Sequence, residues 1–233
     1  VAGGPTPLTV VREVYEGLIH ADSSWCEDIA DLEDVIESLC ELGLLSRREE
    51  LDTHDSSSSS GSVIPVLDAA HGRIREVTVS ELETEELREI HLELANALEA
   101  LGGKPEALAE HLEQAGEYAR AAEYTERAAK QAVETLAFAR AVELYRRTLN
   151  LLDMLEIDDQ LHTIARDSRR QRLRVALAEQ LINFGRSSEA GRLLRELADE
   201  VGQDQKLAFR RQAAEQLLHA GHVSEGMELA GQV

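Results

Sequence analysis

Beyond His71, apolar side chains recur at intervals of three and four residues almost without a break. This spacing places them on one face of an α-helix, so each helix can bury only one side. Aromatic residues make up only 3% of the chain, and Ala, Leu and Glu, which favour helix, are abundant. We therefore predict a mainly α chain. Its clearest apolar stripes lie within residues 87–101, 138–152, 173–184 and 193–201.

Glycines recur in this region at intervals typical of a helical repeat. Gly185 and Gly221 are 36 positions apart, and Gly116 precedes Gly185 by 69, close to two periods of roughly 34 residues, the tetratricopeptide length. Small residues at matching positions around the later glycines would let two helices approach closely. We predict a tetratricopeptide-like array over residues 81–233, with its register around 136–168 left open.

Helix boundaries can also be predicted along the chain. Thr6-Pro7 would provide the cap and first turn of a helix over residues 8–20. Ser80-Glu81-Leu82-Glu83 fits a capping box, Gly102-Gly103 would end the helix that follows, and Pro105 would start the next one.

The first 80 residues have their own order of elements. A helical pattern from Leu32 to Cys40 ends at Gly43, and a short β-branched stretch follows from Val63 to Leu67. Between them, the polar tract 52–62 holds five consecutive serines and is expected to be disordered. Helix, strand, flexible loop and strand are the order of a winged-helix module, so we assign one to residues 1–80, with 52–62 as its wing.

Charge argues against nucleic-acid binding. Asp and Glu number 45 against 24 Lys and Arg, and residues 1–103 hold 23 of the acids but only six of the bases. Too few bases are present to neutralise many phosphates. The candidate recognition helix, Asp31 to Leu42, contains Glu33, Asp34, Glu37 and Glu41 and no base. We therefore expect that the chain binds neither nucleic acid nor a membrane. We also expect a cytoplasmic location, in which Cys26 and Cys40 would be reduced thiols.

No complete catalytic or metal-binding motif is found in the sequence. The stretch Leu101 to Pro105 offers Gly and Lys, but it follows a helix and has Pro where a phosphate loop needs Ser or Thr. We predict that this chain is not an enzyme, and that in isolation it neither hydrolyses ATP nor binds it tightly. His91 and His111 are interpreted as half-buried packing residues, whereas His71 stands at a junction between a strand and a helix.

Three segments resemble the region behind the ATPase module of STAND-type signalling ATPases, including those fused to bacterial serine/threonine protein kinases and maltose-regulator-like activators. They are His71-Gly72-Arg73-Ile74-Arg75-Glu76, the stretch Ile90 to Glu99, and Ala141-Val142-Glu143-Leu144-Tyr145-Arg146-Arg147. The resemblance implies an AAA-type ATPase module upstream of Val1, which would bring ATP or ADP with magnesium. It also implies that residues 8–80 act as an intramolecular lid and that His71 contacts an ADP phosphate in the full-length parent. Gly72 departs from the family, which usually has Asp there.

We therefore expect a regulatory segment of a larger signalling protein, since the chain begins with Val rather than Met. A protein partner would bind the repeat surface from Pro105 to Val201, because stacked repeats leave one face free. A stand-alone repeat adaptor is the alternative, and a transcription regulator is a third.

Overall fold

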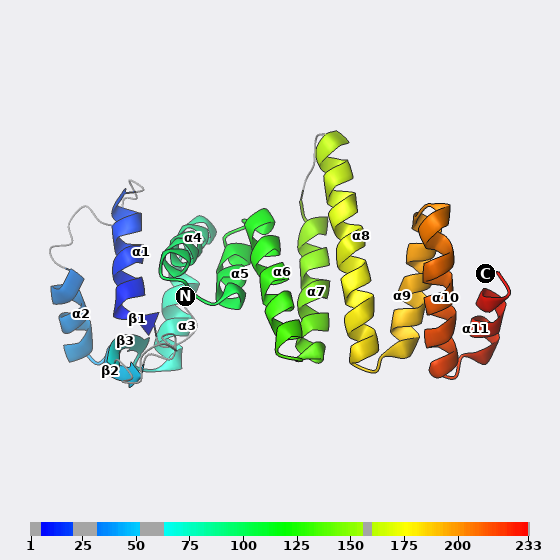
Figure 1. The fold of residues 1–233 in the computed structure, drawn as a ribbon. Helices are drawn as coiled ribbons and strands as arrows, with labels where there is room; N and C mark the ends of the chain where they lie inside the picture. Colours follow the sequence, from blue (N-terminus) through cyan, green and yellow to red (C-terminus); the bar gives the residue numbers. More distant parts are fainter. Residues whose placement is uncertain (1–5, 21–31, 52–62, 156–159, 233) are drawn as a thin grey trace. The chain divides into compact units, whose positions relative to one another are not determined.

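The computed structural model describes residues 6–20, 32–51, 63–155 and 160–232. The chain divides into two compact units, Val1–Glu117 and Tyr118–Val233. We describe each unit by itself (Figure 1). The first unit contains β1 (Thr6–Pro7), α1 (Leu8–His20), α2 (Leu32–Glu41), β2 (Leu45–Leu51), β3 (Val63–Ala69), α3 (Gly72–Glu81), α4 (Thr84–Ala100) and α5 (Pro105–Gln114).

The three strands form one antiparallel sheet in the order β1-β3-β2. Thr6 pairs with Leu67 and Pro7 with Val66, so the prediction that Thr6-Pro7 forms the first turn of a helix is wrong. Pro7 is tolerated because β1 is an edge strand, where a missing N–H removes no interior ladder bond. Helix α1 then begins at Leu8, as predicted.

Helix α1 supplies side chains to two apolar clusters in the first unit. Leu8 joins Ile36 of α2 and Leu67 of β3, with Cys40 packed against them. Val10 joins a second cluster, which contains residues of α4. Burial of two faces of α1 explains why this helix holds α2, the sheet and α4 together.

The boundary between α3 and α4 differs from the sequence prediction. Helix α3 continues through Glu81, and the Ser80 hydroxyl donates to the Val77 carbonyl at 2.8 Å instead of capping α4. The capping box is built by Glu83 and Glu86, where the Glu83 backbone N–H donates to the Glu86 carboxylate at 2.6 Å. The box therefore begins three residues later than predicted.

The second unit is a row of antiparallel helices, each packed on the next one along the chain (Figure 1). This arrangement agrees with the predicted pairing of amphipathic helices. The helices are α6 (Tyr118–Glu134), α7 (Phe138–Asp153), α8 (Gln160–Asn183), α9 (Ser187–Glu200), α10 (Gln203–His219) and α11 (Val223–Ala230).

The structure gives the repeat register that the sequence left open around residues 136–168. Three helices, α6, α7 and α8, lie between Gly116 and Gly185, so this interval does not hold two helix pairs. Leu136 (φ 58°) ends α6 in the conformation that Gly185 (φ 82°) and Gly221 (φ 83°) adopt at the ends of α8 and α10. The pairs are therefore α6/α7, α8/α9 and α10/α11. Gly spacing alone missed the first pair because a leucine occupies the turn position.

The turns of the three pairs share one hydrogen-bond pattern. Leu136 donates to Val133 at 2.9 Å, and the next residue donates to the carbonyl of Ala132 at 2.8 Å. Gly185 with the following Arg186, and Gly221 with the following His222, donate the same two bonds to carbonyls of the preceding helix. This is the pattern of a Schellman motif, which satisfies carbonyls left open at a helix end.

Candidate functional site

His71 lies between β3 and α3, as the sequence predicted. It occupies the N-cap position with extended backbone angles (φ −140°, ψ 141°), and its side chain makes no capping hydrogen bond. The imidazole is exposed, and the Ile74 N–H donates to the His71 carbonyl at 3.0 Å. The backbone of His71 is thus held in place while its ring remains accessible to a partner.

An ion pair fixes the start of α3 to the end of β3. Arg75 donates to the Asp68 carboxylate, and both side chains are partly buried. A second bond nearby runs from the Ala70 N–H to the Leu44 carbonyl at 3.0 Å. The segment that carries His71 is therefore attached to the sheet on both sides.

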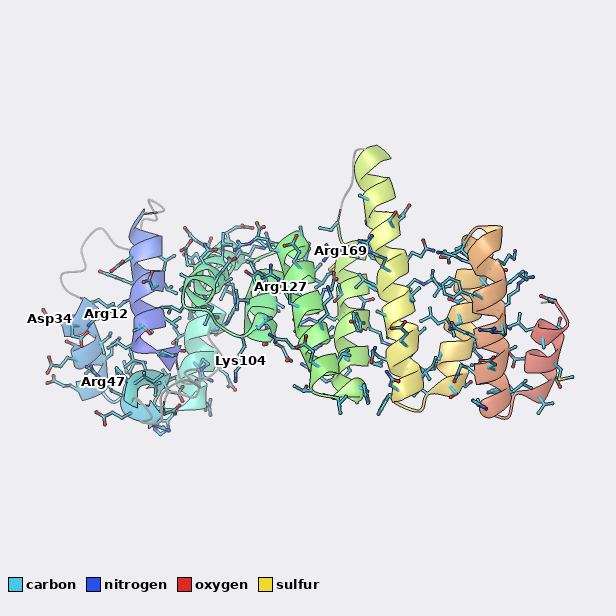
Figure 2. The ribbon with its side chains drawn as sticks, viewed as in Figure 1. Arg12, Asp34, Arg47, Lys104, Arg127 and Arg169 are labelled. Carbon is cyan, nitrogen blue, oxygen red and sulfur yellow. The ribbon has the colours of Figure 1, made fainter. Side chains whose placement is uncertain are left out.

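Glu33 joins three elements of the first unit. Its carboxylate accepts hydrogen bonds from Arg12 of α1 and Arg47 of β2, each at 3.1 Å (Figure 2). Three other acids of α2, Asp34, Glu37 and Glu41, are exposed. The exposed side of α2 is consequently acidic and would repel a phosphate backbone.

Formal charge is distributed very unevenly between the two units. Residues 1–117 contain seven Lys and Arg against 27 Asp and Glu, a net charge of −20. Residues 118–233 contain 17 against 18, a net charge of −1. The second unit can thus approach a partner of either sign without strong long-range repulsion.

Ion pairs in the second unit join alternate helices. Arg169 of α8 reaches Glu126 of α6 at 2.9 Å, and Arg146 of α7 reaches Glu189 of α9 at 2.5 Å. Figure 2 labels Arg169 on its helix. A third pair, Arg195 of α9 with Glu225 of α11 at 3.5 Å, also skips one helix. These pairs place α6 and α8 in one layer and α7, α9 and α11 in the other, and α10 packs on both α9 and α11.

Glu126 is held ionised within its layer. Burial raises its pKa, but hydrogen bonds from Lys130 and Arg169 outweigh this effect and leave the net pKa below its usual value. A charged, hydrogen-bonded carboxylate between two helices restricts their sliding. This layer therefore presents a well-defined surface.

His91 of α4 and His111 of α5 face each other, a contact that the sequence did not predict. Their Nδ1 atoms are 2.9 Å apart and their ring centroids 5.2 Å apart. Burial, and then the charge of His111, lower the pKa of His91 to about 4; burial also lowers the pKa of His111. Both rings are therefore neutral near pH 7, and one Nδ1–H donates to the other Nδ1. No signal in the sequence could reveal this pair, because the two residues lie on different helices.

Among the described residues, no group of three or more His, Cys, Asp or Glu side chains could hold a metal ion. None of the helices in the described part of the chain is long and apolar enough to cross a membrane. Cys40 is half-buried, whereas Cys26 and the serine tract 52–62 lie outside the described residues.

The glycines after α4 serve the end of that helix. Gly102 has a φ of 70°, and the Gly103 N–H donates to the Leu98 carbonyl at 2.7 Å. This N–H is consequently occupied by helix capping. The loop also follows a helix, whereas a phosphate loop follows a strand.

Comparisons with known proteins returned structural similarity only. No protein-family model matches the sequence, and no curated protein matches it. One similar structure is described as kinesin light chain nearly identical TPR-like repeats from Podosopora anserina, with 22% identity and a TM-score of 0.35 over 69% of this chain and 80% of that chain. A substituted form of that protein has 22% identity and a TM-score of 0.34 over the same shares.

Proposed function

We propose that this chain is the regulatory and protein-interaction segment of a multidomain bacterial signalling protein, a STAND ATPase linked to a serine/threonine protein kinase. In this proposal the first unit is a winged-helix lid that responds to the nucleotide state of the ATPase module. The second unit binds the protein that is sensed, and the chain acts by binding rather than by catalysis.

One observation carries the interaction role: the second unit is a row of paired helices in two layers. Each helix packs mainly on its neighbours, so the outer sides of both layers remain free for a partner. Exposed Arg172 lies on α8 and exposed Arg192 on α9, so each layer presents charged side chains to a partner. The near-neutral charge of this unit is compatible with a protein partner of either sign.

Cross-linking in the full-length parent tests this role. A photo-crosslinking amino acid would replace Arg172, on one layer, or Arg192, on the other. Glu76, exposed on α3 of the first unit, is the matched control position. We expect a discrete cross-linked partner from one of the two layers and none from Glu76. A partner that cross-links only through the first unit would contradict the assignment.

The lid role is supported by the order of elements and by His71. A short strand, two helices and two further strands joined in one antiparallel sheet are the elements of a winged helix. His71 stands beside that sheet with an accessible ring, so it can donate a hydrogen bond to an ADP phosphate on an ATPase module.

The lid role predicts a specific effect on nucleotide release. His71→Ala in the parent should remove a bond worth about 1.5 to 3 kcal/mol and speed ADP release about ten- to a hundred-fold. His219→Ala, at an exposed position of α10, is the control and should leave release unchanged. Unchanged ADP release in His71→Ala would contradict the lid role.

A stand-alone repeat adaptor explains the second unit equally well. It requires no ATPase module, and it predicts that partner binding is the same with ADP, with ATP and without nucleotide. The acidic exposed side of α2 disfavours the third hypothesis, a transcription regulator that binds DNA through this helix.

A further inference from the structure

A cavity of about 400 Å³ lies in the first unit, between the sheet and α3. Helix α3 has no fully buried residue, and two of its apolar side chains, Ile74 and Val79, line this space. The wall is mainly aliphatic, and none of the described residues that line it is aromatic. Its main aliphatic contributors are Val11, Leu39, Leu45, Leu67, Ile74 and Leu82.

The charged groups in the wall neutralise each other. Asp68 and Arg75 form the ion pair described above, with side chains that are 18% and 31% exposed. Thr78 also lines the cavity, and its hydroxyl donates to the Ile74 carbonyl at 2.9 Å. A bound molecule therefore meets aliphatic side chains and one paired carboxylate and guanidinium.

We propose that this cavity binds an uncharged, mainly aliphatic small molecule with a single polar head group. Its volume lies within the range of about 300 to 1,000 Å³ that is typical of ligand pockets. The aliphatic wall would bury a hydrocarbon chain, and the ion pair would receive the head group. A charged ligand is disfavoured, because its charge would have to break the Asp68–Arg75 pair to gain a counter-ion.

The position of the cavity gives the ligand a way to act on the fold. Helix α3 connects the sheet to α4, and the Asp68–Arg75 pair joins it to β3. A molecule that fills the cavity would add apolar contacts between α3 and the sheet. This proposal is independent of partner binding by the second unit and of the nucleotide response of the first.

Titration calorimetry with three probes of equal chain length tests the ligand class. Octanol, octanoate and octylammonium differ only in the charge of the head group. We expect the full chain to bind octanol with a dissociation constant roughly tenfold or more below those of both ions. No octanol binding up to its solubility limit would overturn the proposal, as would equal binding of all three probes.

Substitutions in the wall locate the binding site. Ala69→Leu and Thr78→Leu each place a larger aliphatic side chain in the cavity from opposite walls, and either should weaken octanol binding roughly tenfold. Ala100→Leu, at the exposed end of α4, is the matched control and should leave binding unchanged. Circular dichroism identifies any variant that fails to fold. Octanol binding that is unaffected by both cavity substitutions would overturn the assignment of the site.

Substitutions in the ion pair test whether the ligand head group binds there. Asp68→Asn leaves the Arg75 guanidinium without its carboxylate, so the preferred probe should change from octanol to octanoate. Arg75→Gln should instead favour octylammonium. If neither single substitution changes the order of the three affinities, the head group does not bind at this pair and the proposed ligand class is wrong.

Discussion

Leu136 provides a direct test of the turn that the second unit repeats. Its φ of 58° lies in the left-handed region, which costs an L-residue about 1 to 2 kcal/mol. The side chain is 71% exposed, so it repays little of this cost by packing. The equivalent residues at the ends of α8 and α10 are Gly185 and Gly221.

Leu136→Gly should therefore stabilise the second unit. Relief of the left-handed strain gains about 1 to 2 kcal/mol, whereas the greater backbone freedom of glycine in the unfolded chain costs roughly 0.5 to 1 kcal/mol. The net gain is about 0.5 to 1 kcal/mol. The reciprocal change, Gly185→Ala, should destabilise the unit by about 1 kcal/mol. No atom lies within 4 Å of the added Cβ, so this loss would be conformational rather than steric.

Amide hydrogen exchange is the appropriate assay, because a chain with two compact units need not unfold in one step. Protection of the α6 and α7 amides should rise in Leu136→Gly, and protection of the α8 and α9 amides should fall in Gly185→Ala. The first unit serves as the internal control and should not change. The explanation of the turn would be refuted if Leu136→Gly lowered protection in α6 or if Gly185→Ala had no effect.

Three further predictions follow from the packing, the histidine pair and the missing phosphate loop. Gly191→Ala should destabilise the second unit by about 1 to 3 kcal/mol in urea unfolding, since the added Cβ would lie 2.8 Å from the fully buried side chain of Leu217. Gly226→Ala should have a smaller effect, because its Cβ meets Leu218, which is 37% exposed and can move. Because the pKa of His91 falls from 6.5 to about 4 on folding, the unfolded chain takes up the proton first as the pH falls, so stability should be constant above pH 6.5 and decrease between pH 6.5 and about 4. The loss should be well below about 1.4 kcal/mol per pH unit, since the side chain is only partly buried. The double change of His91 and His111 to Gln should remove this part of the slope. Calorimetric titration of the isolated chain with MgATP should show no binding, and a dissociation constant in the micromolar range would contradict the prediction.

Local signals in the sequence predicted many of the elements. Apolar stripes located the core of α4 and α7, Pro105 marked the start of α5, and Gly43 followed the end of α2. These predictions succeeded because apolar periodicity, proline and glycine act within a few residues of the chain. His71 was likewise placed correctly between a strand and a helix.

Tertiary structure decided which helix covers each apolar face. An apolar stripe shows that a helix has a buried side, but many neighbours can satisfy it equally well. The turn at Leu136, the strand at Thr6-Pro7 and the contact of His91 with His111 therefore required the packed chain. The ion pairs between alternate helices, Arg146–Glu189 and Arg169–Glu126, also required the packed chain. The two residues of each pair are 43 positions apart in the sequence, so no local pattern links them. The sequence by itself determined the helical periodicity and the charge of each segment. Only the tertiary structure decided which helices pair, because their apolar faces are chemically alike and can be buried against many partners.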